Sequence, residues 1–162
     1  MTKKNIFDFF IILIIFSLDR ISKVIVIDLN KTNELINYNL TTFINLDLVW
    51  NQGIAFGFFS FNENIYYNVL TSIIIIVTLI VFVLMLKSNR FQKYGFLMVF
   101  GGSLGNIFDR LYYSSVPDFI DLHINNFHWF IFNFADVFIT LGVFFMILLE
   151  IIDNNRDKSE YE

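Results

Sequence analysis

Two aspartates, Asp118 and Asp136, are the residues of this chain best suited to chemistry. Asp118 follows the apolar stretch 94–111, and Asp136 lies just inside the apolar stretch 131–152. If folding brings the two carboxyl groups within hydrogen-bond distance, both cannot ionise easily, so one retains a proton. The ionised group can take a proton from water attacking a peptide carbonyl, while the protonated group stabilises the oxyanion and helps to protonate the leaving amine. The pair therefore predicts peptide hydrolysis that needs no metal ion, cofactor or covalent intermediate.

Further polar residues interrupt the apolar stretches, all toward the end that would hold the aspartate pair. They are Asp19, Arg20 and Lys23 in the first stretch, Asn106, Asp109 and Arg110 in the third, and Asn133 in the fourth. An ionisable side chain at the centre of a bilayer costs roughly 2.5–3.5 kcal/mol, so such residues usually face the protein interior. Asp19 and Lys23 are four residues apart with the acid first, the favourable order for a pair on one helix face. Asn106 and Arg110 share that spacing, one turn beyond Gly102, and are expected on one face.

Several of these groups also have a structural interpretation. Two acid–base pairs can serve as ion pairs that extend toward the membrane surface: Asp19 with Lys23, and Asp109 with Arg110. Asp121 is expected as a solvated loop acid or as a residue at a helix N-terminus. His123 and His128 are five residues apart, a poor helical spacing for a shared metal, so we expect interfacial or loop histidines. Gly101 and Gly105 form a small-xxx-small pair that lets a neighbouring helix approach closely.

The composition is that of an integral membrane protein. Of 162 residues, 56% are hydrophobic and only 16% are charged, and the mean hydropathy is +0.63. An ordinary soluble domain carries roughly a quarter charged residues, so much of this surface must face something other than water. The absence of cysteine excludes thiolate catalysis and disulfide scaffolds. The formal net charge of −4 argues against nucleic acid as a partner.

Four stretches are long and apolar enough for bilayer-spanning helices, which need roughly 20 residues. They are residues 6–27, 66–86, 94–111 and 131–152. With the N-terminus inside, 7 of the 11 basic residues lie on the cytoplasmic side, so both termini are predicted to be cytoplasmic. The first stretch is expected to be retained, because the chain has only two alanines and no A-x-A-like cleavage site follows it.

Two exported segments, 28–65 and 112–130, connect these helices on the outer side. In the first, Ile44, Leu46, Leu48 and Trp50 alternate with other residues, which predicts a strand. Pro117 restricts the residue before it to an extended conformation, which would fix the approach of Asp118. We therefore predict an all-α membrane protein, a single domain over 1–162, with four transmembrane helices and a small extracytoplasmic β element.

The sequence closely resembles the signal peptidase II family of membrane aspartic proteases over nearly its whole length. The resemblance rests on these blocks, in order: Asp19-x-x-x-Lys23; Asn51-x-Gly53-x-Ala55-Phe56; Gly101-Gly102-x-x-Gly105-Asn106-x-x-Asp109-Arg110; Val116-x-Asp118-Phe119-x-Asp121; and Phe132-Asn133-x-Ala135-Asp136 with Gly142. One departure is Ser114-Ser115, where the family often has a glycine. No single block is specific, but their combination on four apolar stretches is.

The resemblance implies an enzyme that cleaves signal peptides from diacylglyceryl-modified prolipoproteins, just before the lipidated cysteine, at the outer face of the bacterial cytoplasmic membrane. It implies that Asp118 and Asp136 are the catalytic dyad. It also implies that other matched positions line or support the site: Asp19, Lys23, Asn51, Gly102, Asn106, Arg110 and Asn133. The expected partners are lipid-modified prolipoproteins, membrane lipids and globomycin-type cyclic peptide inhibitors, with the protein acting as a monomer.

Two other classes of protein place acids within membrane helices. A small transporter or proton relay would predict internal symmetry between the two helix pairs, and the sequence has none that is apparent. A structural or assembly subunit would use its acids only to pair helices. In that case Asp118→Asn and Asp136→Asn would leave function normal.

Overall fold

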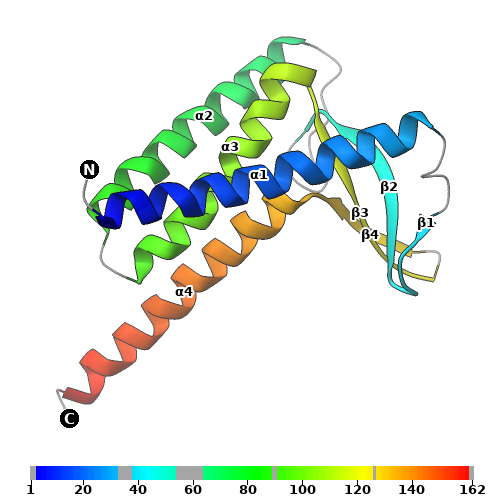
Figure 1. Ribbon diagram of the computed structural model, residues 1–162. Helices are drawn as coiled ribbons and strands as arrows, with labels where there is room; N and C mark the ends of the chain where they lie inside the picture. The colour runs from blue at the N-terminus through cyan, green and yellow to red at the C-terminus, as the bar shows by residue number, and fades with distance from the viewer. Residues whose placement is uncertain (1–2, 33–37, 54–63, 89–90, 126, 161–162) are drawn as a thin grey trace.

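The computed structural model describes residues 3–32, 38–53, 64–88, 91–125 and 127–160, which form four helices and a four-stranded sheet (Figure 1). The helices are α1 (Lys3–Lys31), α2 (Asn64–Lys87), α3 (Gln92–Tyr113) and α4 (Phe134–Glu160). The strands are β1 (Tyr38–Asn39), β2 (Ile44–Asn51), β3 (Val116–Ile124) and β4 (Phe127–Phe132). All neighbouring strands are antiparallel, in the order β1-β2-β3-β4.

Helix α3 is the centre of the bundle, since it packs against each of the other three helices. Two of its glycines make this packing possible. A Cβ atom at Gly102 would lie 2.6 Å from the backbone oxygen of Ala135 in α4, and a Cβ atom at Gly105 would overlap the carboxylate of Asp19 in α1. These close approaches bring the polar residues of α1, α3 and the start of α4 together.

The distribution of polar and apolar side chains is that of a protein surrounded by lipid. Large apolar side chains on α2 and α4 are exposed, for example Ile76, Leu79, Phe144 and Leu148, whereas many charged and amide side chains are buried. Within the described ranges, Ile65–Lys87 and Phe134–Asn154 are long and apolar enough to cross a membrane. Helices α1 and α3 contain most of the buried charged groups, which lowers their apolar content.

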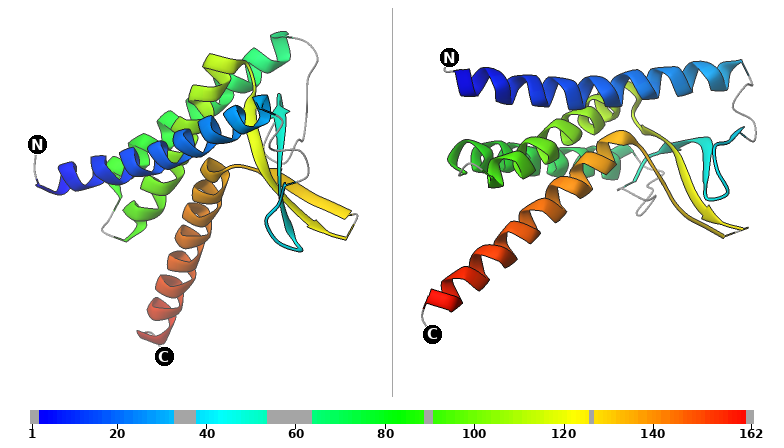
Figure 2. Two further views of the ribbon diagram at one scale, coloured as in Figure 1. Left: turned by 45° about the vertical axis from the view of Figure 1, so that its right-hand side comes forward. Right: turned by 60° about the horizontal axis from the view of Figure 1, so that its bottom comes forward.

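The start of α1, the end of α2, the start of α3 and the end of α4 all lie on the side of the molecule away from the sheet, with the end of α4 splayed apart from the others (Figures 1 and 2). At that end Lys93 of α3 forms an ion pair with Asp8 of α1. The sheet lies across the opposite end of the bundle, where the last turns of α1 pack on it through Val26 and Phe119. All the buried acids of the predicted site therefore lie at the sheet end.

The fold is mostly helical with a small sheet, as predicted, but the sheet has four strands and is larger than the single predicted strand. The predicted strand is confirmed as β2, but segment 112–130 forms most of a β-hairpin rather than a loop. Ile131 and Phe132 belong to β4, so the last helix begins at Phe134 and not at 131. Apolar side chains in 116–132 are branched or aromatic, which favours strands over helix. Ala55 and Phe56 of the family motif lie outside the described residues.

Candidate active site

Asp136 is placed by the way α4 begins. The backbone N–H of Asp136 donates to Oδ1 of Asn133 at 3.1 Å, and the backbone N–H of Asn133 donates to Oδ2 of Asp136 at 3.2 Å. This reciprocal pair has the geometry of a capping box, which satisfies N–H groups that a helix start otherwise leaves unpaired. Asp136 is therefore buried in the first turn of α4, closer to the helix end than a helix beginning at 131 would place it.

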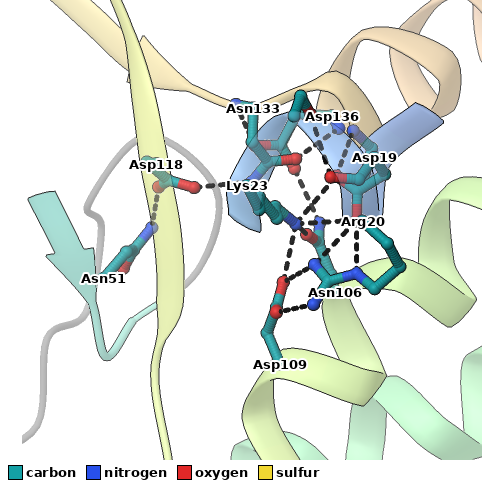
Figure 3. Close-up of polar contacts among 11 residues, drawn as sticks. Asp19, Arg20, Lys23, Asn51, Asn106, Asp109, Asp118, Asn133 and Asp136 are labelled. Atoms are coloured by element: carbon teal, nitrogen blue, oxygen red, sulfur yellow. Dashed lines mark hydrogen bonds and ion pairs between the residues drawn. The ribbon is translucent and has the colours of Figure 1, made fainter. Parts of the chain in front are cut away.

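Asp118 lies on β3 between two amides, one from each side (Figure 3). Its Oδ2 accepts from Nδ2 of Asn51 at 2.8 Å, and its Oδ1 accepts from Nδ2 of Asn133 at 2.6 Å. The orientation of both amides is fixed by their oxygens, since Oδ1 of Asn51 accepts from the backbone N–H of Gly53 at 2.8 Å. The oxygen of Asn133 is occupied in the same way by Asp136. Asn133 thus joins the two acids directly.

A third amide, that of Asn106, binds Asp136. Its Nδ2 donates to Oδ1 of Asp136 at 2.8 Å, while its Oδ1 accepts from Nζ of Lys23 at 3.0 Å. Because an ammonium group can only donate, Lys23 fixes the amide with its nitrogen toward the acid. Each carboxylate of the pair is therefore held by neutral amide donors rather than by a cation.

Burial and the nearby charge of Asp136 raise the pKa of Asp118 from 3.8 to about 7, although the hydrogen bonds from Asn51 and Asn133 lower it. Only 2% of the Asp118 side chain is exposed, so the desolvation of its charged form outweighs the two amide bonds. A buried acid with a pKa in this range beside a second acid retains a proton near neutral pH. This is the condition required for acid–base hydrolysis.

Beside the acid pair lies an ionic cluster, which we define as Asp19, Arg20, Lys23 and Asp109. Lys23 contacts Asp19 at 2.8 Å and Asp109 at 2.6 Å, and Arg20 donates to Asp109 at 2.7 Å. Asp19 also accepts from the backbone N–H of Ala135 at 3.0 Å. The cluster joins α1 and α3 to the first turn of α4, and Lys23 connects it to Asn106.

The predicted pairing of Asp109 with Arg110 is wrong. Asp109 faces α1, while Arg110 faces the other way, donates to the backbone oxygen of Gly53 and lies 5.6 Å from the ring centroid of Tyr67. Arg110 therefore holds the residues that follow β2, next to Asn51. Successive helix residues point in different directions, so the two were poor candidates for a pair.

The predicted site residues fall into three groups. The first group is the acid pair with its amides: Asp118, Asp136, Asn51, Asn106 and Asn133. The second group, Asp19 and Lys23, belongs to the ionic cluster. The third group acts indirectly: Arg110 through its contact with Gly53, and Gly102 through the packing of α3 against α4. Sequence reasoning missed the pairing of Arg20 with Asp109. The sequence signal for this pair is that Arg20 and Asp109 lie at similar depth in their two helices, toward the same membrane face.

Asp121 differs from expectation, and the loop alternative for the two histidines is wrong. Asp121 is neither a solvated loop acid nor at a helix start, because it is buried in β3. It faces Nδ1 of His128 at 2.7 Å. His123 and His128 are cross-strand partners with stacked rings, 5.5 Å between centroids, so they belong to strands and not to a loop.

An apolar helical bundle with a buried, amide-bonded acid pair defines a membrane protein whose site is suited to acid–base hydrolysis. The family described as Signal peptidase (SPase) II matches residues 11–152 of this chain. Similar curated proteins include the lipoprotein signal peptidase of Pelagibacter ubique (strain HTCC1062), 43% identical over 99% of both chains. The lipoprotein signal peptidase of Anaplasma marginale (strain Florida) is 39% identical, over 93% of this chain and 87% of the relative.

Two solved structures have a similar fold. A bacterial membrane enzyme determined by the in meso method at 2.3 Å resolution superposes with a TM-score of 0.73 and 25% identity, covering 92% of this chain and 90% of the other. A second, at 1.9 Å, has a TM-score of 0.66 and 26% identity, covering 88% and 90%. The chain belongs to the signal peptidase II family.

Proposed function

We propose that this protein is a lipoprotein signal peptidase that removes the signal peptide from diacylglyceryl-modified prolipoproteins, with Asp118 and Asp136 as its catalytic dyad. Family membership supports the activity and the membrane location of the enzyme. The single observation that carries the dyad is the shared partner Asn133, which binds Asp118 through its amide nitrogen and Asp136 through its oxygen. The raised pKa of Asp118 supports a retained proton between them.

The chemistry follows from a dyad that holds one proton. The ionised carboxylate takes a proton from water as the water oxygen bonds to the scissile carbonyl carbon, and the protonated carboxyl donates to the carbonyl oxygen. When the tetrahedral intermediate collapses, the C–N bond breaks, a proton passes from the dyad to the leaving amine, and one hydroxyl of the intermediate returns its proton to the dyad as the C=O bond re-forms. The products are a carboxylic acid and an amine, and the dyad again holds one proton.

The supporting residues keep the two acids oriented during this cycle. Asn51 and Asn133 hold Asp118, while Asn106, oriented by Lys23, holds Asp136. Neutral amides can bind a carboxylate in either protonation state without adding a charge that would fix it as ionised. Lys23 acts one step away, through Asn106.

In this proposal the chain is one domain, 1–162, that crosses the bacterial cytoplasmic membrane four times. Both termini are cytoplasmic, and the sheet and the dyad lie at the extracytoplasmic face. The first turn of α1 and the last turn of α4 lie opposite the sheet, which supports this topology, as do the exposed apolar side chains of α2 and α4. Helices α1 and α3 cross with their charged side chains directed inward.

The proposed partners are membrane lipids and globomycin-type cyclic peptides, and the protein acts as a monomer. An inhibitor of that type would occupy the dyad in place of the substrate. A cavity of about 210 Å³ adjoins Asp136, with apolar walls from Phe130, Phe132 and Leu141. It offers an apolar group of substrate or inhibitor a place beside the dyad.

The test is an in-vitro assay with purified full-length protein in detergent and a precursor carrying diacylglyceryl on its cysteine. We expect cleavage before that cysteine, no cleavage of the unlipidated precursor, block by globomycin and full activity in the presence of a chelator. The matched control is Asp47→Asn, since Asp47 is an exposed acid on β2. Equal cleavage of both precursors would contradict the substrate class, and activity lost to chelation and restored by zinc would contradict the metal-free dyad.

A further inference from the structure

Asp121 is a buried acid that the proposed reaction does not use. Its side chain is 2% exposed, and its Oδ2 lies 2.7 Å from Nδ1 of His128 on β4, a residue whose own side chain is 56% exposed. His123 is more distant, with Nδ1 3.9 Å from the same oxygen. Burying a carboxylate is unfavourable unless it is paired. Among the described residues, the contact with His128 is the shortest polar contact of the Asp121 side chain, and it stabilises Asp121 within the sheet.

The contact spans an irregularity in the pairing of β3 with β4. Asp121 pairs with Ile131 and Leu122 with Phe130, but His123 then pairs with His128, so Trp129 has no partner opposite it. One extra residue on one strand is a β-bulge. Asp121 lies on one side of this bulge and His128 on the other, so their side chains fix how many residues of β4 lie between.

Burial does little to fix the register of β4. Its first four residues, Phe127 to Phe130, are all exposed, and register is weakly specified where neither face of a strand is buried. A slip of one residue would move β4 along β3 by about 3.4 Å. Asn133, which binds both acids of the dyad, follows β4 directly. A slip would therefore displace Asn133 and Asp136 relative to Asp118.

We propose that Asp121 and His128 lock the register of the β3–β4 hairpin (Figure 1) and so set the position of Asp136 relative to Asp118. Asp121 is thus a positioning residue for the reaction, acting through His128 and β4. This inference rests on the proposed dyad. The β3–β4 hairpin, which connects Asp118 to Asp136 along the chain, therefore controls the distance between the two carboxyl groups.

The test uses His128, because an exposed residue can be truncated without loss of the fold. His128→Ala removes the donor, whereas His128→Asn retains one, since the asparagine Nδ2 occupies nearly the position of the histidine Nδ1. Loss of a hydrogen bond to a charged group predicts a fall in kcat of about tenfold for His128→Ala, with KM within about twofold of wild type. His128→Asn is expected to restore most of kcat. Phe127→Ala, an exposed neighbour on β4, is the matched control and keeps wild-type kcat.

Hydrogen exchange of the β4 amides supplies a readout independent of catalysis. We expect faster exchange at Phe130–Phe132 in His128→Ala and wild-type exchange in His128→Asn and Phe127→Ala. Wild-type kcat and exchange in His128→Ala would overturn the lock, as would a loss of kcat that His128→Asn does not reverse. If Asp118→Asn were fully active, the dyad itself would fail, while the exchange measurement would still decide whether the lock exists.

Discussion

Two groups of buried carboxylates lie side by side in this protein and differ in what surrounds them. In the ionic cluster, Asp19 and Asp109 face two cations, Arg20 and Lys23, so formal charges cancel. In the dyad, the hydrogen-bond donors that the described residues present to Asp118 and Asp136 are amides and backbone N–H groups. Cations fix a carboxylate as ionised and hold helices together, whereas neutral donors orient a carboxylate and leave it able to exchange a proton.

Lys23 connects the two groups and marks the boundary between them. It pairs with both acids of the cluster and also orients the amide of Asn106, which binds Asp136. The positive charge thus remains one amide away from the dyad. The amide of Asn106 thus fixes the orientation of Asp136 without placing a cation against its carboxylate.

The largest effect is expected from the dyad itself. Asp118→Asn and Asp136→Asn should each lower kcat/KM for the lipidated precursor by about 10³–10⁴-fold, because an amide cannot exchange a proton with water and the leaving amine. Expression and thermal unfolding in detergent should show that both variants fold. Normal turnover by either folded variant would remove the distinction between the two groups of acids.

Replacement of Lys23 tests whether this residue belongs to the ionic cluster rather than to the dyad. Lys23→Met keeps the volume but leaves Asp19 and Asp109 with Arg20 alone, which should cost ~3–5 kcal/mol of stability. We expect a clear fall in Tm and a loss of activity smaller than that of the dyad variants, since Asn106 loses only its orientation. A well-folded Lys23→Met protein with no activity would instead place Lys23 in the chemistry.

Asn51 tests how neutral donors tune the dyad. Its hydrogen bond lowers the pKa of Asp118, so Asn51→Ala should raise that pKa further above 3.8. The proton would then be retained to higher pH, and the alkaline decline of kcat should move upward. A reduction of kcat by about 3–10-fold should accompany the shift, from the lost orientation of Asp118. An alkaline decline that moves downward would reverse the assigned role.

The smallest effect is expected at the end of α3, away from both acid groups. Ser114 caps this helix with φ 56° and ψ 25°, the left-handed conformation that glycine adopts without strain. Ser114→Gly should therefore raise the free energy of unfolding by about 1 kcal/mol, with kcat unchanged. Thermal unfolding of the pair of proteins measures this. A lower free energy of unfolding for Ser114→Gly would contradict the claim that the backbone of Ser114 is strained.

The cluster and the dyad were not equally predictable from sequence. Helical spacing predicts the pair of Asp19 with Lys23, and alternation predicts strand β2. The structure confirms both predictions. The partner of Asp109 depends on how α1 rotates against α3, and the glycine contacts that set this rotation become visible only after packing. Local spacing therefore favoured Arg110, although Arg20 and Lys23 are the partners.

The hairpin shows a second limit. Segment 112–130 is short and contains a proline, which favours a loop, and the apolar run through Phe132 favours an extension of the last helix, whereas the structure has β3 and β4 there. The asparagine that ends β4 is the better boundary signal, since Asn133 and Asp136 have the spacing of a capping box. The pairing of Asp121 with His128 depends on a bulge, which the pattern of residues did not indicate.

The most direct test of a dyad with one retained proton is the pH dependence of kcat for the wild-type enzyme on the lipidated precursor. Burial and the charge of Asp136 raise the pKa of Asp118 to about 7, so the shared proton is present below that pH and lost above it. We expect a rate that is maintained in weak acid and declines with an apparent pKa at or above about 7. A rate that has already declined by about pH 5, near the ordinary pKa of a carboxyl group, would contradict it.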